Sequence, residues 1–329
     1  AGVFFCIYGA QCGRVLASSA GKFPHMGANC ITHPGIHLEK LFVSGHQQNA
    51  GKDIQTGLGG FDRMAVFRQH PGLAHKILVN GSREGWHDFN EEFPMYSSHF
   101  NRTEDAPCGS DPMLMFFTSG TSGYPKLAAH NYKYPLGHFI TAKYWHRVNP
   151  DGLHLTISDT GWAKSMWGKL YGQWLCESAI FVYDFDRFDA EKILPMFAKH
   201  HFTTFCAPPT MYRMLIKQDL SRFDLSSIEH ASTAGEALNP EVYRQFKKHT
   251  GLAIKEGFGQ SESTIIIGNL TGQSHKVGSM GKPVPLYDVH LLDVDGNEVE
   301  RGEPGEVCIN IAQGLPSGLS YGYEGNDEV

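Results

Sequence analysis

The sequence predicts an α/β fold, and three observations lead to this prediction. From about residue 110 onward, short apolar runs of the length of buried strands alternate with segments that carry helix-capping signals. One of these runs leads directly into a loop of glycine and hydroxyl-bearing residues. After Pro283 the pattern changes to alternating apolar and polar residues around a turn, which is typical of a β-hairpin in a small barrel.

The elements follow in order along the chain. Buried strands are expected at the short apolar runs, residues 113–117, 153–157, 178–182, 203–206 and 253–256. Helices are expected at residues 132–144, 190–199, 211–217 and 240–250. Asp189 and Asn239 can act as N-caps, Pro240 suits a first helical position, and Gly251 suits a C-terminal cap. The hairpin is expected over residues 289–293 and 305–311, with its turn at Asp295 and Gly296.

The loop after residues 113–117 has the composition of a phosphate-binding loop. Its glycines permit positive φ and close backbone approach, its hydroxyls can donate to phosphate oxygens, and Lys126 adds a positive charge. The nucleoside triphosphatase pattern G-x-x-x-x-G-K-[ST] does not fit, because Gly123 is followed by Tyr-Pro-Lys. The hydrolase pattern G-x-S-x-G does not fit either, since Ser122 directly precedes Gly123. A plain surface loop is the alternative interpretation.

Five further blocks follow this loop in a fixed order. They begin at Ile157 (Ile-Ser-Asp-Thr-Gly-Trp), Ala207 (Ala-Pro-Pro-Thr-Met-Tyr-Arg-Met-Leu), Thr233 (Thr-Ala-Gly-Glu-Ala-Leu), Glu256 (Glu-Gly-Phe-Gly-Gln-Ser-Glu) and Gly278 (Gly-Ser-Met-Gly-Lys-Pro-Val-Pro). With the loop, they resemble the adenylate-forming (AMP-binding) superfamily, and within it acyl-CoA synthetases of the medium-chain or acetyl-CoA synthetase-like type. The resemblance runs from about residue 78 to 329.

The resemblance implies the fold of the large N-terminal domain of these enzymes, with helix-covered sheets and a small β-barrel portion. It divides the chain into a divergent or foreign segment (residues 1–75), an α/β AMP-binding core (76–282) and the start of the barrel (283–329). The family continues with a block that binds the ribose and with a C-terminal domain that carries a catalytic lysine. The chain ends before both, so we expect it to be truncated, with weak or no activity alone.

The resemblance also implies the roles of particular residues. Lys126, Ser261 and Glu262 would be catalytic, with Ser261 in the place of the usual threonine and donating to the α-phosphate. Mg²⁺ would be bound by Glu262 and Thr121, and Trp162 would lie at the acyl pocket. The ATP-binding set would be Thr118, Ser119, Gly120, Thr121, Ser122, Gly123, Tyr124, Pro125, Lys126, Gly235, Glu236, Ala237, Glu256, Gly257, Phe258, Gly259, Gln260 and Ser261.

Taken without the family, several of these residues have simpler interpretations. Glu262 is then a surface acid, and Phe258 and Trp162 are core aromatics. Trp167 and Trp174, on the following helical stretch, are expected in the core. His130 would support the phosphate loop or lie on the surface.

Composition excludes several classes of protein. The formal charge of −6 provides no basic face for nucleic acid, and no apolar run reaches the ~18 residues of a membrane span. The seven cysteines are scattered without a C-x-x-C pair, which favours reduced thiols over a disulfide framework or zinc site. These features predict a cytoplasmic enzyme whose partners are small molecules.

Residues 1–75 lack the periodicity of the rest. They contain twelve glycines and six histidines but only three acidic residues, and they offer little apolar surface to offset the entropy of ordering. Four of the histidines, with Cys30, suggest a metal site, but their spacing matches no common one. We expect this segment to be loosely attached, which limited proteolysis would test.

The function expected from the resemblance is ATP-dependent acyl-CoA synthesis. A carboxylic acid and ATP give acyl-AMP and pyrophosphate, and CoA then gives the acyl-CoA of fatty acid metabolism, with ATP and CoA as co-substrates and Mg²⁺ as the metal. The alternatives are another enzyme with the same fold, either an adenylation domain that loads a carrier protein or a luciferase-like oxidase, and a non-catalytic nucleotide-binding fragment.

Overall fold

The computed structural model describes residues 5–6, 40–43, 75–78, 81–99, 101–118, 126–158, 163–183, 185 and 187–324 of the chain. The chain divides into two compact units, and we describe each by itself. Residues 1–132 and 323–329 form the first unit, and residues 133–322 form the second. The sequence analysis expected domain boundaries after residues 75 and 282, whereas the two units divide after residues 132 and 322. Most of residues 1–75, and the proposed looseness of this segment, lie outside the described residues.

The first unit contains two small sheets. One is a parallel sheet in the order β2-β3-β4, made of β2 (Lys40–Val43), β3 (His75–Leu78) and β4 (His87–Asp88). A helical turn follows it, in which the Asp88 carboxylate accepts hydrogen bonds from the first amides; it consists of α2 (Phe89–Glu92) and η1 (Phe93–Met95). The other sheet has the order β1-β5-β6-β16, with β1 (Phe5–Cys6), β5 (Pro112–Thr118), β6 (Lys126–Asn131) and β16 (Gly322–Tyr323).

Strand β6 is an element that the sequence pattern did not predict. β5 confirms the strand expected at residues 113–117, but the chain returns antiparallel to it as β6 before the next helix begins. The alanines of β6 carry little strand propensity, whereas pairing with β5 buries Ala128, Ala129 and His130 completely. His130 therefore lies inside, with its ring 5.7 Å from that of Phe116.

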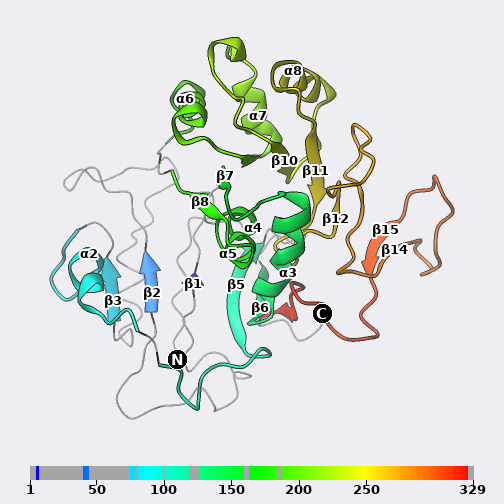
Figure 1. Cartoon of the computed structure of the whole chain (residues 1–329). Coiled ribbons are helices and arrows are strands. Elements are labelled where there is room, and N and C mark those ends of the chain that lie inside the picture. The colour runs from blue at the N-terminus through cyan, green and yellow to red at the C-terminus, as the bar shows by residue number, and fades with distance from the viewer. Residues whose placement is uncertain are drawn as a thin grey trace, which may run out of the picture. The chain divides into compact units, whose positions relative to one another are not determined.

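The second unit is built on a seven-stranded sheet with the order β13-β12-β11-β10-β9-β7-β8. Its strands are β7 (Leu153–Thr156), β8 (Ala179–Phe181), β9 (Thr204–Cys206), β10 (His230–Ala234), β11 (Ile254–Phe258), β12 (Ile267–Gly268) and β13 (Lys282–Pro283). The five strands from β8 to β11 are parallel, and β12 and β13 are added antiparallel. The sheet confirms the α/β fold predicted from the sequence (Figure 1).

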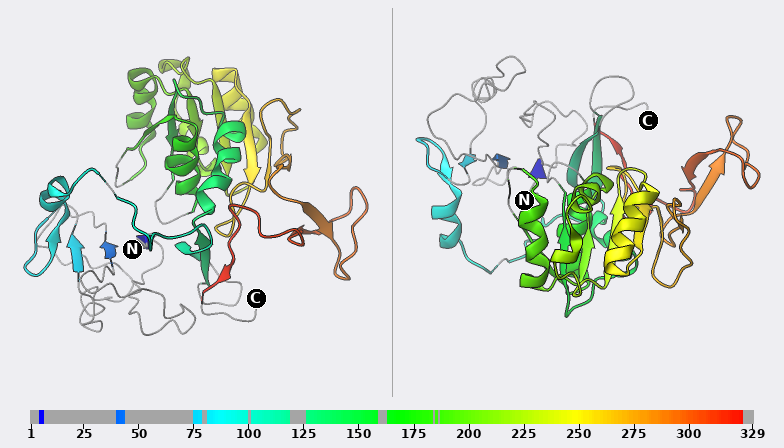
Figure 2. Two further views of the ribbon diagram at one scale, coloured as in Figure 1. Left: turned by 60° about the horizontal axis from the view of Figure 1, so that its bottom comes forward. Right: turned by 90° about the horizontal axis from the view of Figure 1, so that it is seen from above.

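Three helices cover one face of this sheet. They are α6 (Ala190–His200), α7 (Pro209–Leu215) and α8 (Pro240–Thr250), which lie in a row in Figures 1 and 2. Their apolar side chains form a continuous core with Leu155, Phe205, Ala231 and Ile254 of the strands. The expected caps are confirmed, because Asp189 and Asn239 accept amide hydrogen bonds at the helix starts and Gly251 ends α8 with φ of 75°. A 3₁₀ turn, η3 (Leu220–Arg222), links α7 to β10.

A second set of helices lies on the other face. It comprises α3 (Tyr134–Ile140), the π-helical turn η2 (Thr141–Trp145), α4 (Lys164–Lys169) and α5 (Tyr171–Leu175). Trp145 and Trp167 are buried edge to face, with ring centroids 6.1 Å apart. The expectation that Trp174 is a core residue is wrong, because it lies near the end of α5 and is 59% exposed. The helix expected at residues 132–144 is confirmed with a π turn in its second half.

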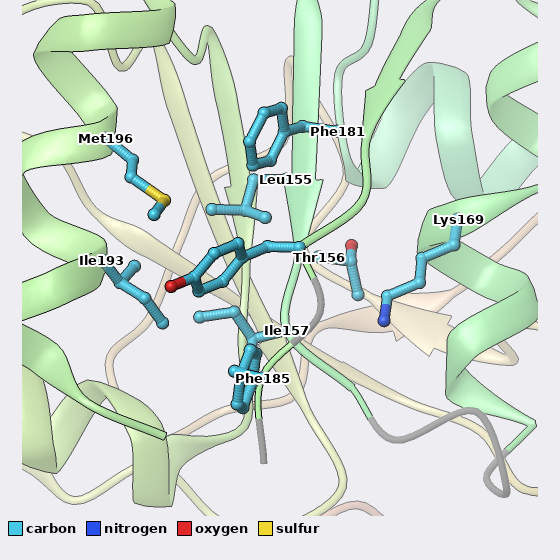
Figure 3. A pocket seen from close by; sticks show the side chains of 9 residues that line it. Leu155, Thr156, Ile157, Lys169, Phe181, Phe185, Ile193 and Met196 are labelled. Carbon is cyan, nitrogen blue, oxygen red and sulfur yellow. The ribbon is translucent and has the colours of Figure 1, made fainter. Parts of the chain in front are cut away.

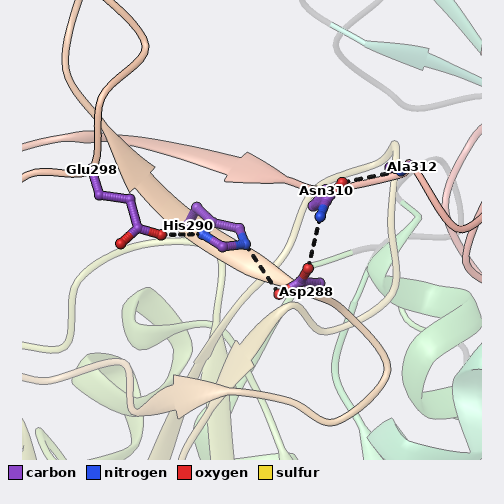
Figure 4. A network of polar contacts seen from close by, with 5 residues as sticks. All are labelled: Asp288, His290, Glu298, Asn310 and Ala312. Carbon is purple, nitrogen blue, oxygen red and sulfur yellow. Dashed lines mark hydrogen bonds and ion pairs between the residues drawn. The ribbon is translucent and has the colours of Figure 1, made fainter.

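The expected β-hairpin is confirmed as β14 (Val289–Leu292) and β15 (Glu306–Ile309), with Gly296 in its turn at φ of 83°. His290 lies on β14 between two carboxylates and donates a ring N–H to Glu298 and to Asp288 (Figure 4). These two bonds raise the pKa of His290. Asn310 binds the other oxygen of Asp288, so the network ties the ends of both strands together at the surface.

Two expectations from composition can be checked in the described residues. The four cysteines whose side chains the structure describes, Cys108, Cys176, Cys206 and Cys308, are free thiols, in line with the predicted reduced state. Within the same part of the chain, the helices are too short or too polar to cross a membrane.

Candidate functional site

The carboxyl ends of β10 and β11 bring two of the predicted blocks side by side. Ala234 of β10 pairs with Gly257 of β11, so Gly235, which follows β10, and Phe258, the last residue of β11, come next along two neighbouring strands. Ligands of open α/β sheets bind at the carboxyl ends of strands. The family resemblance implies that the adenine of ATP lies between residues 235–237 and Phe258. The pairing of β10 with β11 is compatible with that arrangement.

The loop after β10 is available to a ligand. Gly235, Glu236 and Ala237 are all exposed, and Gly235 adopts a φ of 105°, which favours glycine. The Glu236 carboxylate accepts a hydrogen bond from the backbone N–H of Thr210 in the first turn of α7, which fixes the loop against that helix. Phe258 is half-buried and packs against the apolar cluster that contains Trp145 and Trp167.

The turn after β11 carries the predicted catalytic pair. Residues 260–263 are closed by reciprocal bonds, since Gln260 N–H donates to the Ser263 hydroxyl and Ser263 N–H donates to the Gln260 carbonyl. The Glu262 carbonyl accepts the N–H of Ser320 at 2.7 Å, which anchors the turn from outside. Ser261 and Glu262 are both half-buried, so this braced turn holds a hydroxyl and a carboxylate near the surface.

Gly257 and Gly259 have a packing role in the structure. A Cβ at Gly257 would approach the Trp145 ring to 2.7 Å, and a Cβ at Gly259 would approach the Trp167 ring to 2.3 Å and the Thr264 carbonyl oxygen to 2.5 Å. Both glycines thus let the buried tryptophans lie close under the site. Their contact with the nucleotide stays a prediction.

We therefore expect Gly259→Ala to destabilise the protein by about 1–3 kcal/mol, because backbone or ring atoms must move to admit the methyl group. Thermal unfolding measures this. Gln260→Ala in the same turn, where the side chain is exposed, is the matched control and should change the melting temperature little. Equal melting temperatures for Gly259→Ala and the natural protein would contradict the packing role.

Lys164 is a residue of this site that sequence reasoning missed. It begins α4, two positions after Trp162, and its ammonium group donates to the carbonyl of Ala234 at 2.7 Å. Burial lowers the pKa of Lys164, while the nearby Cys206 and Glu236 oppose that effect. The block that supplied Trp162 continues as Ala-Lys, so a signal was present in the sequence, but nothing distinguished this lysine from a surface one.

The predicted phosphate loop belongs to the first unit. Thr118 ends β5 and pairs with Lys126 at the start of β6, so residues 119–125 connect two antiparallel strands. The Lys126 ammonium lies 4.7 Å from the centre of the Tyr323 ring, a cation–π contact. The remaining predicted residues of the loop, Ser119, Gly120, Thr121, Ser122, Gly123, Tyr124 and Pro125, lie outside the described residues, as does Trp162.

The residues present fit a magnesium ion that is bound mainly through phosphate. Mg²⁺ is usually held by one or two carboxylates, with substrate phosphates and water completing its oxygen ligands. Glu262 offers such a carboxylate at a strand end, next to the Ser261 hydroxyl. In the described residues, no three His, Cys, Asp or Glu side chains are grouped to hold a metal by themselves, so this fit requires a phosphate ligand.

A mostly apolar pocket lies between α6 and the ends of β7 and β8 (Figure 3). It encloses about 290 Å³, which includes solvent at its mouth, and its lining residues are Leu155, Thr156, Ile157, Lys169, Phe181, Tyr183, Phe185, Ile193 and Met196. The Lys169 ammonium donates to the Ser158 carbonyl. Among the described residues, none of those predicted to bind ATP lines this pocket.

The fold defines a class: α/β proteins with a mostly parallel sheet, whose ligands bind at the carboxyl ends of the strands. Comparison with known proteins identifies the family. Residues 64–317 match the family of AMP-binding enzymes, and the chain belongs to this family. The match begins before the boundary expected near residue 76.

The curated relatives are acyl-CoA synthetases. The chain is 37% identical over 264 residues to the human protein "Acyl-coenzyme A synthetase ACSM3, mitochondrial", covering 80% of this chain and 45% of that protein. It is 38% identical over 310 residues to the human "Acyl-coenzyme A synthetase ACSM5, mitochondrial", covering 92% and 53%. A match of that length takes in part of the first 75 residues. The chain spans about half the length of these relatives.

Solved structures agree with the family. An anthranilate CoA ligase, AuaEII, in complex with anthranoyl-AMP matches with a TM-score of 0.71 and 25% identity over 80% of this chain and 51% of the other. An acyl-CoA synthetase of Brucella canis matches with a TM-score of 0.68 and 26% identity, over 80% and 53%. The predicted fold class and the predicted family are thus both confirmed.

Proposed function

We propose that this chain provides the nucleotide and acid platform of an ATP-dependent acyl-CoA synthetase. The observation that supports the proposal is the register of β10 and β11, in which Ala234 pairs with Gly257, so that the exposed loop 235–237 follows β10 where Phe258 ends β11 and the chain continues to the Ser261–Glu262 turn. Membership of the AMP-binding family, with acyl-CoA synthetases among the relatives, supports the same reaction class.

The proposed chemistry is the activation of a carboxylate by ATP. A carboxylate is a weak nucleophile, so it must be held in line with the α-phosphate while charge on the departing pyrophosphate is neutralised. The carboxylate needs no general base, because it carries no proton to remove. An acyl-adenylate and pyrophosphate result, and the thiol of CoA then displaces AMP.

Individual residues have proposed roles in this reaction. Loop 235–237 and Phe258 would hold the adenine on opposite faces, and the Ser261 hydroxyl would donate to an α-phosphate oxygen. Glu262 would hold Mg²⁺, which when bound supplies charge neutralisation at the phosphates. Lys126 and loop 118–126 would bind the terminal phosphates, and Trp162 would contact the acid, both by family resemblance.

The acid and the compartment are further proposals. We propose a medium-chain or aromatic acid, because the Ser-Asp-Thr-Gly-Trp and Tyr-Arg-Met-Leu blocks resemble the medium-chain type. The sequence predicts the cytoplasm, whereas the human relatives are named as mitochondrial proteins; both compartments agree with free thiols.

Nucleotide binding and pyrophosphate exchange test the proposal. We expect the purified chain to bind ATP with Mg²⁺, and the natural gene product that contains it to exchange pyrophosphate into ATP only with an acid from a panel of butyrate, octanoate and benzoate. Thioester formation with CoA separates the synthetase from an adenylation domain, which would transfer the acyl group only to a carrier protein. ATP binding without exchange for any acid would favour the non-catalytic alternative.

A further inference from the structure

Glu256 differs from the other residues of its block. It lies inside β11 and is only 7% exposed, whereas Ser261 and Glu262 lie on the turn beyond the strand end. A buried carboxylate is costly unless its charge is met by hydrogen bonds or a cation. In the described part of the chain, no lysine or arginine forms an ion pair with Glu256. Its charge must therefore be stabilised by other donors.

Those donors are two backbone amides from separate loops. One carboxylate oxygen, Oε1, accepts the N–H of Leu238 at 3.3 Å, and the other, Oε2, accepts the N–H of Gly278 at 3.2 Å. Leu238 directly follows the exposed loop 235–237 and precedes the N-cap of α8. One side chain thus joins the loop after β10 and the loop around Gly278 to β11.

The backbone of Glu256 fixes the same region from the other side. Its carbonyl oxygen accepts hydrogen bonds from the Trp145 indole at 3.2 Å and from the Asn269 side chain at 3.1 Å. The Asn269 amide also donates to the Ser279 carbonyl at 2.8 Å, so the Gly278 loop is held a second time. Burial raises the pKa of the Glu256 carboxyl, and the two amide bonds oppose that rise by favouring the charged form.

We propose that Glu256 is a positioning residue for the nucleotide: its carboxylate holds loop 235–238 and the Gly278 loop in the arrangement that binds ATP. That the ligand is ATP rests on the proposed function. That Glu256 holds the two loops in place does not depend on it. The sequence analysis expected Glu256 to contact the nucleotide directly. We infer instead that Glu256 acts on the nucleotide through its hydrogen bonds to the N–H groups of Leu238 and Gly278. No cavity or ion is needed for this role, only the two amide contacts.

Glu256→Gln tests the inference with little change in shape. The amide oxygen can accept one N–H, but its NH₂ group then faces the other N–H, so one loop is released. We expect amide hydrogen exchange to speed up at least 10-fold at Leu238 or Gly278, and the Kd for ATP to rise about 10-fold, the effect of one lost hydrogen bond to a charged group. The Kd for the acid should stay within about twofold, because the bond is made to the nucleotide loops.

Phe197→Leu is the matched control for stability. Phe197 is a buried residue of α6 in the apolar core and forms none of the hydrogen bonds of Glu256, so its substitution should lower the melting temperature without changing ATP affinity. If Glu256→Gln leaves both the amide hydrogen exchange at Leu238 and Gly278 and the Kd for ATP unchanged, the inference is overturned. An equal loss of ATP affinity in Phe197→Leu would overturn it too, because it would show a general effect of stability. Failure of the natural protein to bind ATP would instead refute the proposed function. Amide hydrogen exchange at Leu238 and Gly278 would then still test whether Glu256 holds the two loops.

Discussion

Replacing Glu262 by glutamine is expected to lower the rate of acyl-adenylate formation by on the order of 100-fold. The substitution keeps the size of the side chain and removes its charge, which would weaken the proposed bond to Mg²⁺. The metal contributes several kcal/mol to stabilising phosphate charge in the transition state, and each 1.4 kcal/mol corresponds to about tenfold in rate. The affinity for the acid should change little, because the acid does not bind the metal. Pyrophosphate exchange in the natural gene product measures the rate.

A second measurement separates metal binding from a general loss of activity. We expect the Mg²⁺ concentration that half-saturates ATP binding to rise in Glu262→Gln. Glu241→Gln on the exposed surface of α8 is the control, and it should leave both the exchange rate and the Mg²⁺ dependence unchanged. If Glu262→Gln exchanges pyrophosphate at the natural rate, Glu262 is not part of the site.

Much of the second unit could be predicted from local signals. The caps at Asp189, Asn239 and Gly251 act within one turn of their helices, so sequence shows them directly. Strand β6 could not be predicted, because Ala128 and Ala129 become strand residues through pairing with β5 rather than through their own preference. The exposure of Trp174 likewise depends on where α5 ends over the sheet.

Prediction of the candidate site from the sequence was limited in the same way, by contacts between distant residues. Motif order brought Gly235, Phe258 and Glu262 into one prediction, and the parallel register of β10 and β11 confirms that the first two are neighbours. The motif did not show that Glu256 accepts bonds from Leu238 and Gly278, because those partners are 18 and 22 residues away. Long-range contacts of this kind depend on the tertiary fold, and a single sequence does not record them.

A layer of buried histidines lies between the sheet and η2. His154 contacts the hydroxyls of Thr204 and Thr156 at 2.6 and 2.7 Å, and His146 contacts that of Ser232 at 2.9 Å. A further histidine, His230, donates to the Trp145 carbonyl at 2.7 Å. The rings of His146 and His154 are 4.7 Å apart. Charging any of these rings would place a cation in a buried site beside the others.

Burial therefore lowers the pKa of all three histidines. The pKa of His154 falls to about 3 and that of His230 to about 4, with burial as the main cause, and the pKa of His146 falls well below its usual value. In the unfolded chain each histidine binds a proton near pH 6.5. Below that pH the unfolded state binds more protons than the folded state, so stability is lost as pH falls from about 6.5 toward 4. Above pH 6.5 the three histidines have no such effect.

Acidification from pH 7.5 to 5.5 should thus destabilise the protein by about 1 kcal/mol for each buried histidine, or about 3 kcal/mol for the layer. This is a large part of the 5–15 kcal/mol typical of a domain. His290 acts in the opposite direction, because its carboxylate partners raise its pKa, and so the test uses differences between variants. Urea unfolding across this pH range should show His154→Asn losing less stability on acidification than the natural protein, by about 1 kcal/mol. Phe197→Leu, which removes no titratable group, should keep the natural pH dependence, and an identical dependence in His154→Asn would mean that His154 takes up its proton at the same pH in the folded and unfolded states.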